Sequence, residues 1–390
     1  MSSQITSESD RRQIISAVRE FVQRDVNPVA SKYDEEDVYP HELIPIMSEL
    51  GLFGITIPVE YGGLGLDHKT FAMIFEEISK GWMSLSGILG THHLLSHIIW
   101  TYGSEIQKRE YLPLMSSGDL RGGLALTESE AGSDVSNIST VATKEGEEYV
   151  INGNKMFISN GEHGNVFALL AKTDLTCEPA HKGISCFIFQ TPVEGFQVGQ
   201  HIDKLGYRGI DTVELIFDNC RISTDNLIGH HEGEGFYQVM DGLEVGRINV
   251  AARAVGVAQA AFDAALKYAT QREAFGKTIG RHQAIQLKLA DMASKIHAAR
   301  LMVYDAAEKK DQGQRNDLEA AMAKLFASEA CGEVVMEAMR IHGGVGYTKD
   351  LPIERYYRDA PLMIIGEGTN EIMKLIIGRR LLENYENLRR

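Results

Sequence analysis

Glu367 stands between Gly366 and Gly368 in the stretch PLMIIGEGTNEIMKLI, residues 361–376. Four apolar residues precede the glycines, and a helical pattern of apolar residues follows them. A carboxylate on a bare loop beside an apolar surface can act as a general base, because desolvation raises its pKa. A structural interpretation also stays open, since a glycine can end one element and a Thr or Asn can cap the next.

A second group of candidate residues combines hydroxyl groups with glycine. Thr127, Gly132, Ser133 and Ser159 fall within residues 124–161, LALTESEAGSDVSNISTVATKEGEEYVINGNKMFISNG. Hydroxyls and exposed backbone N–H groups on strands and turns can bind a flat polar ring and a pyrophosphate. The simpler interpretation is a solvated turn in a β domain.

The familiar phosphate-binding motifs are incomplete. FGKT at 275–278 matches the end of a P-loop, but Gln271 occupies the position of its first glycine. GGLGLDH places His68 where the last glycine of a GxGxxG motif belongs. Any nucleotide cofactor must therefore be bound by another architecture.

We predict no metal site. His93 and His97 stand one helical turn apart, but Leu94 occupies the place of the acid in the HExxH motif. The four cysteines lack CxxC spacing, which argues against a zinc site or a disulfide framework and is typical of a reducing compartment.

Composition and charge exclude several classes of protein. The chain has 390 residues, of which 44% are hydrophobic, and a net charge of -15. This charge argues against nucleic acid or an anionic membrane as the main partner. Neither a targeting peptide nor a transmembrane-length run is visible, so we expect a soluble protein in the cytoplasm.

The pattern of apolar residues predicts three domains. Helical periodicity dominates residues 1–125, and short runs rich in Val, Ile, Phe and Tyr between turn residues indicate a β domain at 126–235. Residues 236–390 are again helical, with an Ala-rich stretch that permits close helix packing. The expected fold class is α+β multidomain.

Seven segments, in order along nearly the whole chain, resemble the acyl-CoA dehydrogenase family. They are LTESEAGSD, INGNKMFISNG, KLGYRGIDTVELIFDNCRI, LEVGRINVAARAVG, REAFGKTIGRHQAIQLKLADM, RIHGGVGYTKDLPIERYYRDA and IIGEGTNEIMKLIIGRR. The resemblance implies an N-terminal helical domain, a middle domain with a β-barrel-like or sandwich arrangement, and a C-terminal four-helix bundle. It also implies FAD bound without a Rossmann fold.

By this resemblance, the FAD-binding residues fall into three groups. Those from the middle domain are Leu124, Ala125, Leu126, Thr127, Gly132, Ser133, Phe157, Ile158 and Ser159. Those that would reach the FAD of a neighbouring subunit are Arg272, Phe275, His282, Gln283, Arg340, Ile341, His342, Gly343 and Gly344. Those after the catalytic acid are Thr369, Asn370 and Glu371. The family is usually a homotetramer, a dimer of dimers.

The resemblance assigns the reaction and the remaining site residues. Glu367 would remove the α-proton of an acyl-CoA thioester while flavin N5 accepts the β-hydride, giving a trans-2-enoyl-CoA. Electrons would then pass to electron-transferring flavoprotein, as in β-oxidation. Residues that would contact the substrate are Ser133, Glu244, Val245, Gly246, Arg247 and Gly368. Some relatives carry the base at the position of Gly246 instead.

Departures from the family pattern bear on the substrate and on the FAD site. Gly366 replaces the bulky aromatic of many straight-chain members, so a short, branched or cyclic acyl group is expected, unless another side chain fills the space. Leu85 occupies the position of the arginine that glutaryl-specific relatives use, which argues against a glutaryl-type substrate. Ser129 and Glu130 replace the common proline-glycine turn, and Phe157 replaces a frequent Trp.

Two other functional classes remain open. The same fold serves acyl-CoA oxidases and flavin monooxygenases, in which oxygen meets the reduced flavin. It also serves non-catalytic assembly or nucleic-acid-binding factors, against which Glu367 and the acidic charge both count.

Overall fold

The computed structural model describes residues 5–388, so the first four and last two residues of the predicted domains lie outside it. Helices form the N-terminal part, and polar side chains cap several of them. Asp67, for example, accepts a hydrogen bond from the Thr70 N–H at 2.7 Å, and Ser104 forms a capping box with Gln107. These helices are α1 (Glu8–Phe21), α2 (Ala30–Glu36), α3 (Leu43–Glu49), α4 (His68–Gly81), α5 (Met83–Tyr102) and α6 (Glu105–Ser117).

A seven-stranded sheet forms the middle of the chain, in the order β1-β4-β2-β3-β7-β6 with β5 paired to β4. Its strands are β1 (Gly122–Ala125), β2 (Val141–Glu145), β3 (Glu148–Ser159), β4 (Val166–Lys172), β5 (Ile184–Gln190), β6 (Phe196–His201) and β7 (Thr212–Ser223). The antiparallel register of β3 with β7 shifts between Lys155 and Ile158. Such an irregularity can redirect a side chain out of the sheet.

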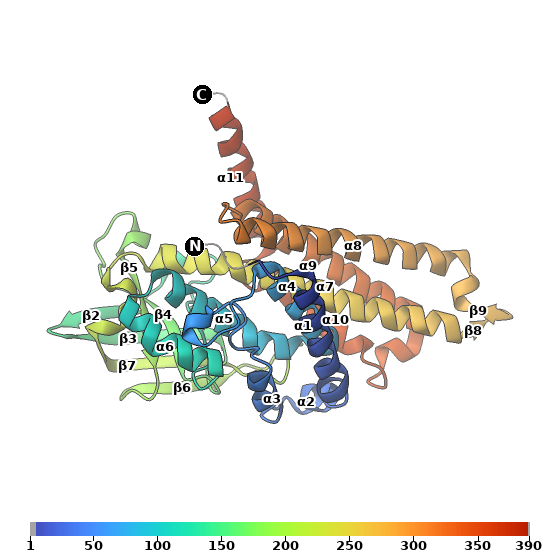
Figure 1. Cartoon of the computed structure of the whole chain (residues 1–390), viewed down its shortest axis with the longest axis horizontal. Helices are drawn as coiled ribbons and strands as arrows, with labels where there is room; N and C mark the ends of the chain where they lie inside the picture. Colours follow the sequence, from blue (N-terminus) through green and yellow to red (C-terminus); the bar gives the residue numbers. More distant parts are fainter. Residues whose placement is uncertain (1–4, 389–390) are drawn as a thin grey trace.

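Long helices form the C-terminal part: α7 (Gly235–Gln271), α8 (Gln283–Asp311), α9 (Asp317–His342), α10 (Ile353–Ile365) and α11 (Asn370–Leu388). The hairpin of β8 (Glu273–Ala274) and β9 (Lys277–Thr278) joins α7 to α8. Figure 1 shows the sheet at one end of the longest axis, this hairpin at the other, and α11 projecting away from the rest.

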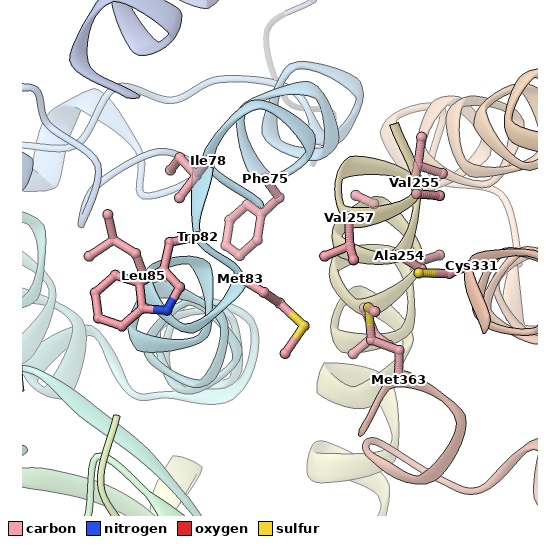
Figure 2. Close-up of a cluster of buried hydrophobic side chains, with 14 of the residues drawn as sticks. Phe75, Ile78, Trp82, Met83, Leu85, Ala254, Val255, Val257, Cys331 and Met363 are labelled. Carbon is pink, nitrogen blue, oxygen red and sulfur yellow. The ribbon is translucent and has the colours of Figure 1, made fainter. Parts of the chain in front are cut away.

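Small residues let α7 pack closely against its neighbours. A Cβ added at Gly256 would lie 2.4 Å from the backbone oxygen of Glu76 in α4. Figure 2 shows Phe75 and Met83 between α4, α5 and α7, with Cys331 of α9 and Met363 of α10 beside Ala254. The order of helices, sheet and helices confirms the fold class that the sequence predicts.

The sequence contains no apolar run of transmembrane length, and the helices of the structure allow a second comparison with that expectation. Among residues 5–388, no helix combines the length and the apolar character that crossing a bilayer requires.

Candidate active site

The loop between α10 and α11 presents Glu367 in a constrained conformation. Glu367 has φ 55° and Gly368 has φ 91°, both in the left-handed region. Lys324 of α9 restrains the loop, because its Nζ donates hydrogen bonds to the backbone oxygens of Ile364 at 3.1 Å and Gly368 at 2.8 Å. It also donates to Asn370 Oδ1 at 2.9 Å. The position of Glu367 is thus fixed by hydrogen bonds to the loop on both sides.

The Glu367 carboxylate itself has no such partner. Its Oε2 atom is fully buried and accepts no hydrogen bond from any residue between 5 and 388. Burial raises the pKa of Glu367 to about 7, against the opposing charges of Arg253, Arg247 and Lys324. A desolvated carboxylate that titrates near neutral pH is suited to accept a proton from a weak carbon acid.

Gly246 of α7 leaves room for this carboxylate. A Cβ at Gly246 would lie 1.6 Å from Glu367 Oε2, so no other residue fits there without displacing the acid. A side chain at Gly246 and the Glu367 carboxylate would therefore occupy the same space in this chain.

The middle-domain residues named from the sequence lie close together around the end of β3. The Met156 N–H donates to Thr127 O at 2.8 Å, and a Cβ at Gly132 would lie 3.8 Å from Thr127 Cγ2. Phe157 has φ 61° and is 58% exposed, because the irregularity in β3 turns its ring out of the sheet. A Cβ at Gly123 of β1 would lie 2.7 Å from Ser159 O.

Glu128 and Lys155 fix the turn that follows β1. Glu128 accepts hydrogen bonds from the backbone N–H and the hydroxyl of both Ser139 and Thr140, and from Lys155 Nζ at 2.8 Å. Burial alone would raise the pKa of Glu128, but Lys155 and these donors hold it at about 2. Ion pairing and hydrogen bonding thus stabilise a turn whose sequence lacks the family's proline and glycine.

Tyr207 connects the middle domain to Glu367. Burial and the Glu367 carboxylate raise the pKa of the Tyr207 hydroxyl, whereas Arg253 and a hydrogen bond with Ser159 oppose this shift. The Arg253 guanidinium lies over the Tyr207 ring at 4.9 Å from its centroid. The residues named from the middle domain and those around Glu367 therefore belong to one region of the molecule.

The four residues Glu244–Arg247 occupy one turn of α7. Arg247 is buried, its Nε has no hydrogen-bond partner among the described residues, and burial lowers its pKa. Burial raises the pKa of Glu244, which lies 3.6 Å from Lys310 Nζ and lines a cleft of about 1150 Å³. Val245 instead packs into the hydrophobic core, and Ser133 is exposed on the turn after β1.

The residues assigned to a neighbouring subunit's FAD lie far from Glu367. Arg272, Phe275, His282 and Gln283 surround the β8–β9 hairpin, roughly 38 Å along α7 from Gly246. Phe275 is 95% exposed and meets the His282 ring edge-on. Arg340–Gly344 close α9, where His342 stacks on Tyr268 at a centroid distance of 4.5 Å. One chain does not bring these residues to its own base.

The residues after the base begin α11. Thr369 Oγ1 accepts from the Ile372 N–H at 3.4 Å, and Glu371 is exposed. The buried Asn370 amide donates to Ser328 and Glu329, at 3.0 and 2.9 Å. The assignment of Asn370 to FAD stays a prediction.

Sequence reasoning overlooked five buried residues that shape this site: Tyr207, Arg253, Lys324, Glu128 and Lys155. The only feature of the sequence that could have identified such residues is a charged residue within an apolar stretch, as at Arg253 in VAARAVGVAQAAF. His92 and His93 behave as packing residues, because they bond the backbone oxygens of Phe53 and Leu52, each at 2.9 Å, whereas His97 pairs with Asp241 at 2.9 Å.

Comparisons with known proteins match almost all of the chain. Models of the acyl-CoA dehydrogenase N-terminal, middle and C-terminal domains match residues 8–119, 123–220 and 233–382. An acyl-CoA dehydrogenase of Bacillus subtilis (strain 168) is 43% identical over 366 residues, covering 94% of this chain and 96% of that protein. The mitochondrial short-chain specific acyl-CoA dehydrogenase of Rattus norvegicus is 41% identical over 370 residues, covering 95% and 89%.

Solved structures share the fold. The structure of butyryl-CoA dehydrogenase from Megasphaera elsdenii superposes with a TM-score of 0.94 at 36% identity, covering 97% of this chain and all (100%) of that one. Sequence, fold and site geometry agree: this chain belongs to the acyl-CoA dehydrogenase family, whose members are FAD-dependent oxidoreductases.

Proposed function

We propose that this protein oxidises the Cα–Cβ bond of an acyl-CoA thioester to a trans-2-enoyl-CoA, with Glu367 as the α-proton base. One observation carries the proposal: Glu367 Oε2 is buried without a hydrogen-bond partner among residues 5–388, and its pKa is raised to about 7. A carboxylate with a purely structural role is normally paired or hydrogen-bonded when buried.

The residues around the end of β3 fit FAD. The exposed ring of Phe157 offers a stacking surface, and the neighbouring Thr127 and Ser159 supply hydroxyls for the polar edge of a flat ring. Gly343 and Gly344 have open space around them, as a close approach by a pyrophosphate requires. When bound, FAD would supply the acceptor for the β-hydride.

The chain's own groups would carry the proton chemistry. Glu367 accepts the α-proton at its carboxylate: the substrate C–H bond breaks, an O–H bond forms, and the electron pair moves toward the thioester. The backbone N–H of Glu367 would donate to the thioester oxygen, where negative charge develops. The bare backbone of Gly368 allows the thioester to approach the base.

The CoA portion would be held by Ser133 and by the turn Glu244–Arg247. Arg247 suits an anionic or polar partner, because it is buried with an unpartnered Nε. A neighbouring subunit would complete the FAD site with the hairpin residues, which lie too far along α7 to serve their own chain. We therefore infer a homodimer at least, and a tetramer of two such dimers.

The space at Gly366 supports a short, branched or cyclic acyl group. The three atoms nearest to a Cβ built there all belong to Leu362, whose backbone oxygen lies at 3.2 Å and whose Cδ1 lies at 3.9 Å. Leu362 therefore borders the space beside Gly366, where an aromatic ring is expected in many relatives. Electron-transferring flavoprotein is the proposed acceptor of the electrons.

The decisive experiment compares wild type with Glu367→Gln. Under anaerobic conditions, a panel of straight, branched and cyclic acyl-CoAs should bleach the flavin of the wild type. The variant should keep FAD but bleach at least about 10²-fold more slowly, since it lacks the general base. Glu147→Gln, which changes an exposed glutamate in the β2–β3 turn, serves as the control.

Two outcomes would contradict parts of the proposal. Bleaching by Glu367→Gln at the wild-type rate would refute the base assignment. Rapid reoxidation of the bleached flavin by oxygen, without electron-transferring flavoprotein, would identify an oxidase instead.

A further inference from the structure

One face of α7 carries a polar stripe that begins at the base. Gly246, Asn249 and Arg253 are spaced three and four residues apart and so lie on the same side of the helix. Gly246 touches the Glu367 carboxylate, and a Cβ at Gly90 of α5 would lie 2.5 Å from Asn249 Nδ2. The side of α7 that runs from Glu367 toward α5 is therefore polar.

Two side chains in this stripe lack the partners that buried polar groups normally have. Asn249 is 1% exposed, and neither its Oδ1 nor its Nδ2 makes a hydrogen bond among the described residues. Arg253 is 5% exposed, and its Nε and Nη2 are likewise unpartnered. The Arg253 charge faces the Glu367 carboxylate and hydrogen-bonds the Tyr207 side chain, but these contacts leave Nε and Nη2 without an acceptor among the described residues. Buried N–H groups without an acceptor are costly, so a ligand is expected to supply one.

The unpartnered atoms of Arg253 specify the kind of ligand. Nε and Nη2 lie on one edge of the guanidinium and present two parallel N–H groups. This spacing matches the two oxygens of a carboxylate, and charge-assisted pairs of this type are the strongest hydrogen bonds that arginine makes. The guanidinium lies over the Tyr207 ring, 4.9 Å from its centroid, and hydrogen-bonds the Tyr207 side chain, so Tyr207 restrains its position.

The packing of Tyr207 against Gly87 restrains the position of the Tyr207 ring. A Cβ at Gly87 of α5 would lie 1.9 Å from the Tyr207 hydroxyl, so the ring occupies space that only a glycine leaves open. Tyr207 has φ 57°, and its N–H donates to Asp359 Oδ1 at 2.7 Å. Arg253 is therefore held by an ordered neighbour.

The position of Arg253 relative to the base sets the length of the acyl group. Gly246 and Arg253 are two helical turns apart, about 10 Å along the axis, and helix side chains tilt back toward the N-terminus. The Arg253 charge lowers the pKa of Glu367 more than Arg247 or Lys324 does, which agrees with a short gap. A short acyl chain would span from the base to the guanidinium.

We propose that the acyl group ends in a carboxylate bound by the Nε–Nη2 edge of Arg253, so that the substrates are CoA monothioesters of short dicarboxylic acids. This inference rests on the function proposed above. Leu85, at the position of the arginine in glutaryl-specific relatives, argued against such a substrate, but Arg253 supplies a cation from a different helix.

Matched thioesters test the proposal. Succinyl-CoA and glutaryl-CoA carry a carboxylate where butyryl-CoA and pentanoyl-CoA carry a methyl group. Binding is measured by titration calorimetry in the FAD-loaded Glu367→Gln protein, and flavin bleaching is measured in the protein with Glu367 intact. We expect each dicarboxylic thioester to bind about 10- to 100-fold more tightly than its methyl counterpart. Arg253→Gln, made in both proteins, should abolish this preference.

Two further variants separate recognition from structure. Arg253→Lys keeps the positive charge but lacks the two parallel N–H groups, so it should retain only part of the preference for the dicarboxylic thioesters. Arg12→Gln, which removes an exposed arginine of α1, should change nothing. Arg253→Gln also removes the contact with Tyr207 and the charge that faces Glu367, so its melting temperature is compared with that of Arg253→Lys. A preference lost in Arg253→Gln and partly kept in Arg253→Lys, at equal melting temperatures, identifies recognition, whereas a preference that falls only with the melting temperature would overturn it.

The outcomes distinguish this inference from the proposed function. Equal binding of both thioester classes, a preference that survives in Arg253→Gln, or loss of FAD from that variant would overturn the carboxylate site. If no acyl-CoA bleached the flavin of the wild type, the proposed function would fail. The binding preference would still decide whether Arg253 recognises a carboxylate.

Discussion

Two glutamates with buried carboxylate oxygens near the site show how surroundings set the role of a residue type. Glu128 is surrounded by donors from Ser139, Thr140 and Lys155, which hold its pKa at about 2. Glu367 Oε2 has no donor among residues 5–388, and burial raises its pKa to about 7. The first carboxylate is a fixed anion that stabilises a turn, whereas the second can take up a proton near neutral pH.

The raised pKa of Glu367 predicts a pH-dependent stability difference. Its folded-state value of about 7 lies above the ordinary 4.5, so stability from this group is fully present below about pH 4.5 and is lost as pH rises through 7. Glu367→Gln removes this titration. Thermal unfolding should show the variant more stable than wild type at pH 8 and nearly equal to it at pH 4.5.

The groups that face Glu367 come from three elements: Arg247 and Arg253 of α7, Lys324 of α9, and Tyr207 of the β6–β7 loop. Glu147→Gln should show no pH-dependent difference from wild type. A stability difference for Glu367→Gln that is the same at both pH values would contradict the raised pKa.

At the scale of elements, the turn after β1 positions the residues proposed to meet FAD. Glu128 and Lys155 are both buried and form an ion pair at 2.8 Å. The Lys155 Nζ also donates to Leu126 O at 3.0 Å, which ties β3 to the segment that carries Thr127. The order of this turn therefore depends on a long-range contact between two strands.

Glu128→Gln should weaken both the fold and FAD binding. The substitution leaves Lys155 buried without a counter-charge, which costs about 3–5 kcal/mol when a buried pair is broken. Denaturant unfolding and the flavin content of the purified protein measure the two effects. Glu130→Gln, in the same turn but exposed, should behave as wild type. Full stability and flavin content in Glu128→Gln would refute this account of the turn.

Much of the fold could be predicted from the sequence, because local periodicity marks helices and strands. The exposed backbone of the Glu367 loop could also be predicted, since its flanking glycines are adjacent in the chain, whereas the catalytic role of Glu367 stays a prediction. The pairing of Glu128 with Lys155, and of Arg253 with Tyr207, could not, because each joins segments far apart in the sequence. Ala-rich surroundings made the Arg253 stretch resemble a plain packing helix.

At the scale of the whole molecule, the proposed FAD site would be completed by a second chain. Figure 1 shows the β8–β9 hairpin at the end of the long axis opposite the sheet. Phe275 at its tip is 95% exposed. Apart from its edge-on contact with His282, a ring that is so exposed buries little surface in its own chain, so it is available to contact another subunit.

Phe275→Ala should therefore reduce the flavin content without unfolding the chain. Circular dichroism should be unchanged, while absorbance near the flavin bands and the mass from light scattering should both report the loss of a shared site. Leu175→Ala, an exposed apolar residue near the sheet, is the matched control. A monomeric wild type with full flavin content would contradict the shared site.

The contact between Gly246 and Glu367 also has an evolutionary consequence. A side chain at either position would enter the same space, although the two residues lie on different elements. A lineage could therefore transfer the acid from the loop to α7 with two substitutions, Gly246→Glu and Glu367→Gly. The acid proposed as the base would then keep its place in the site while its place in the sequence changes.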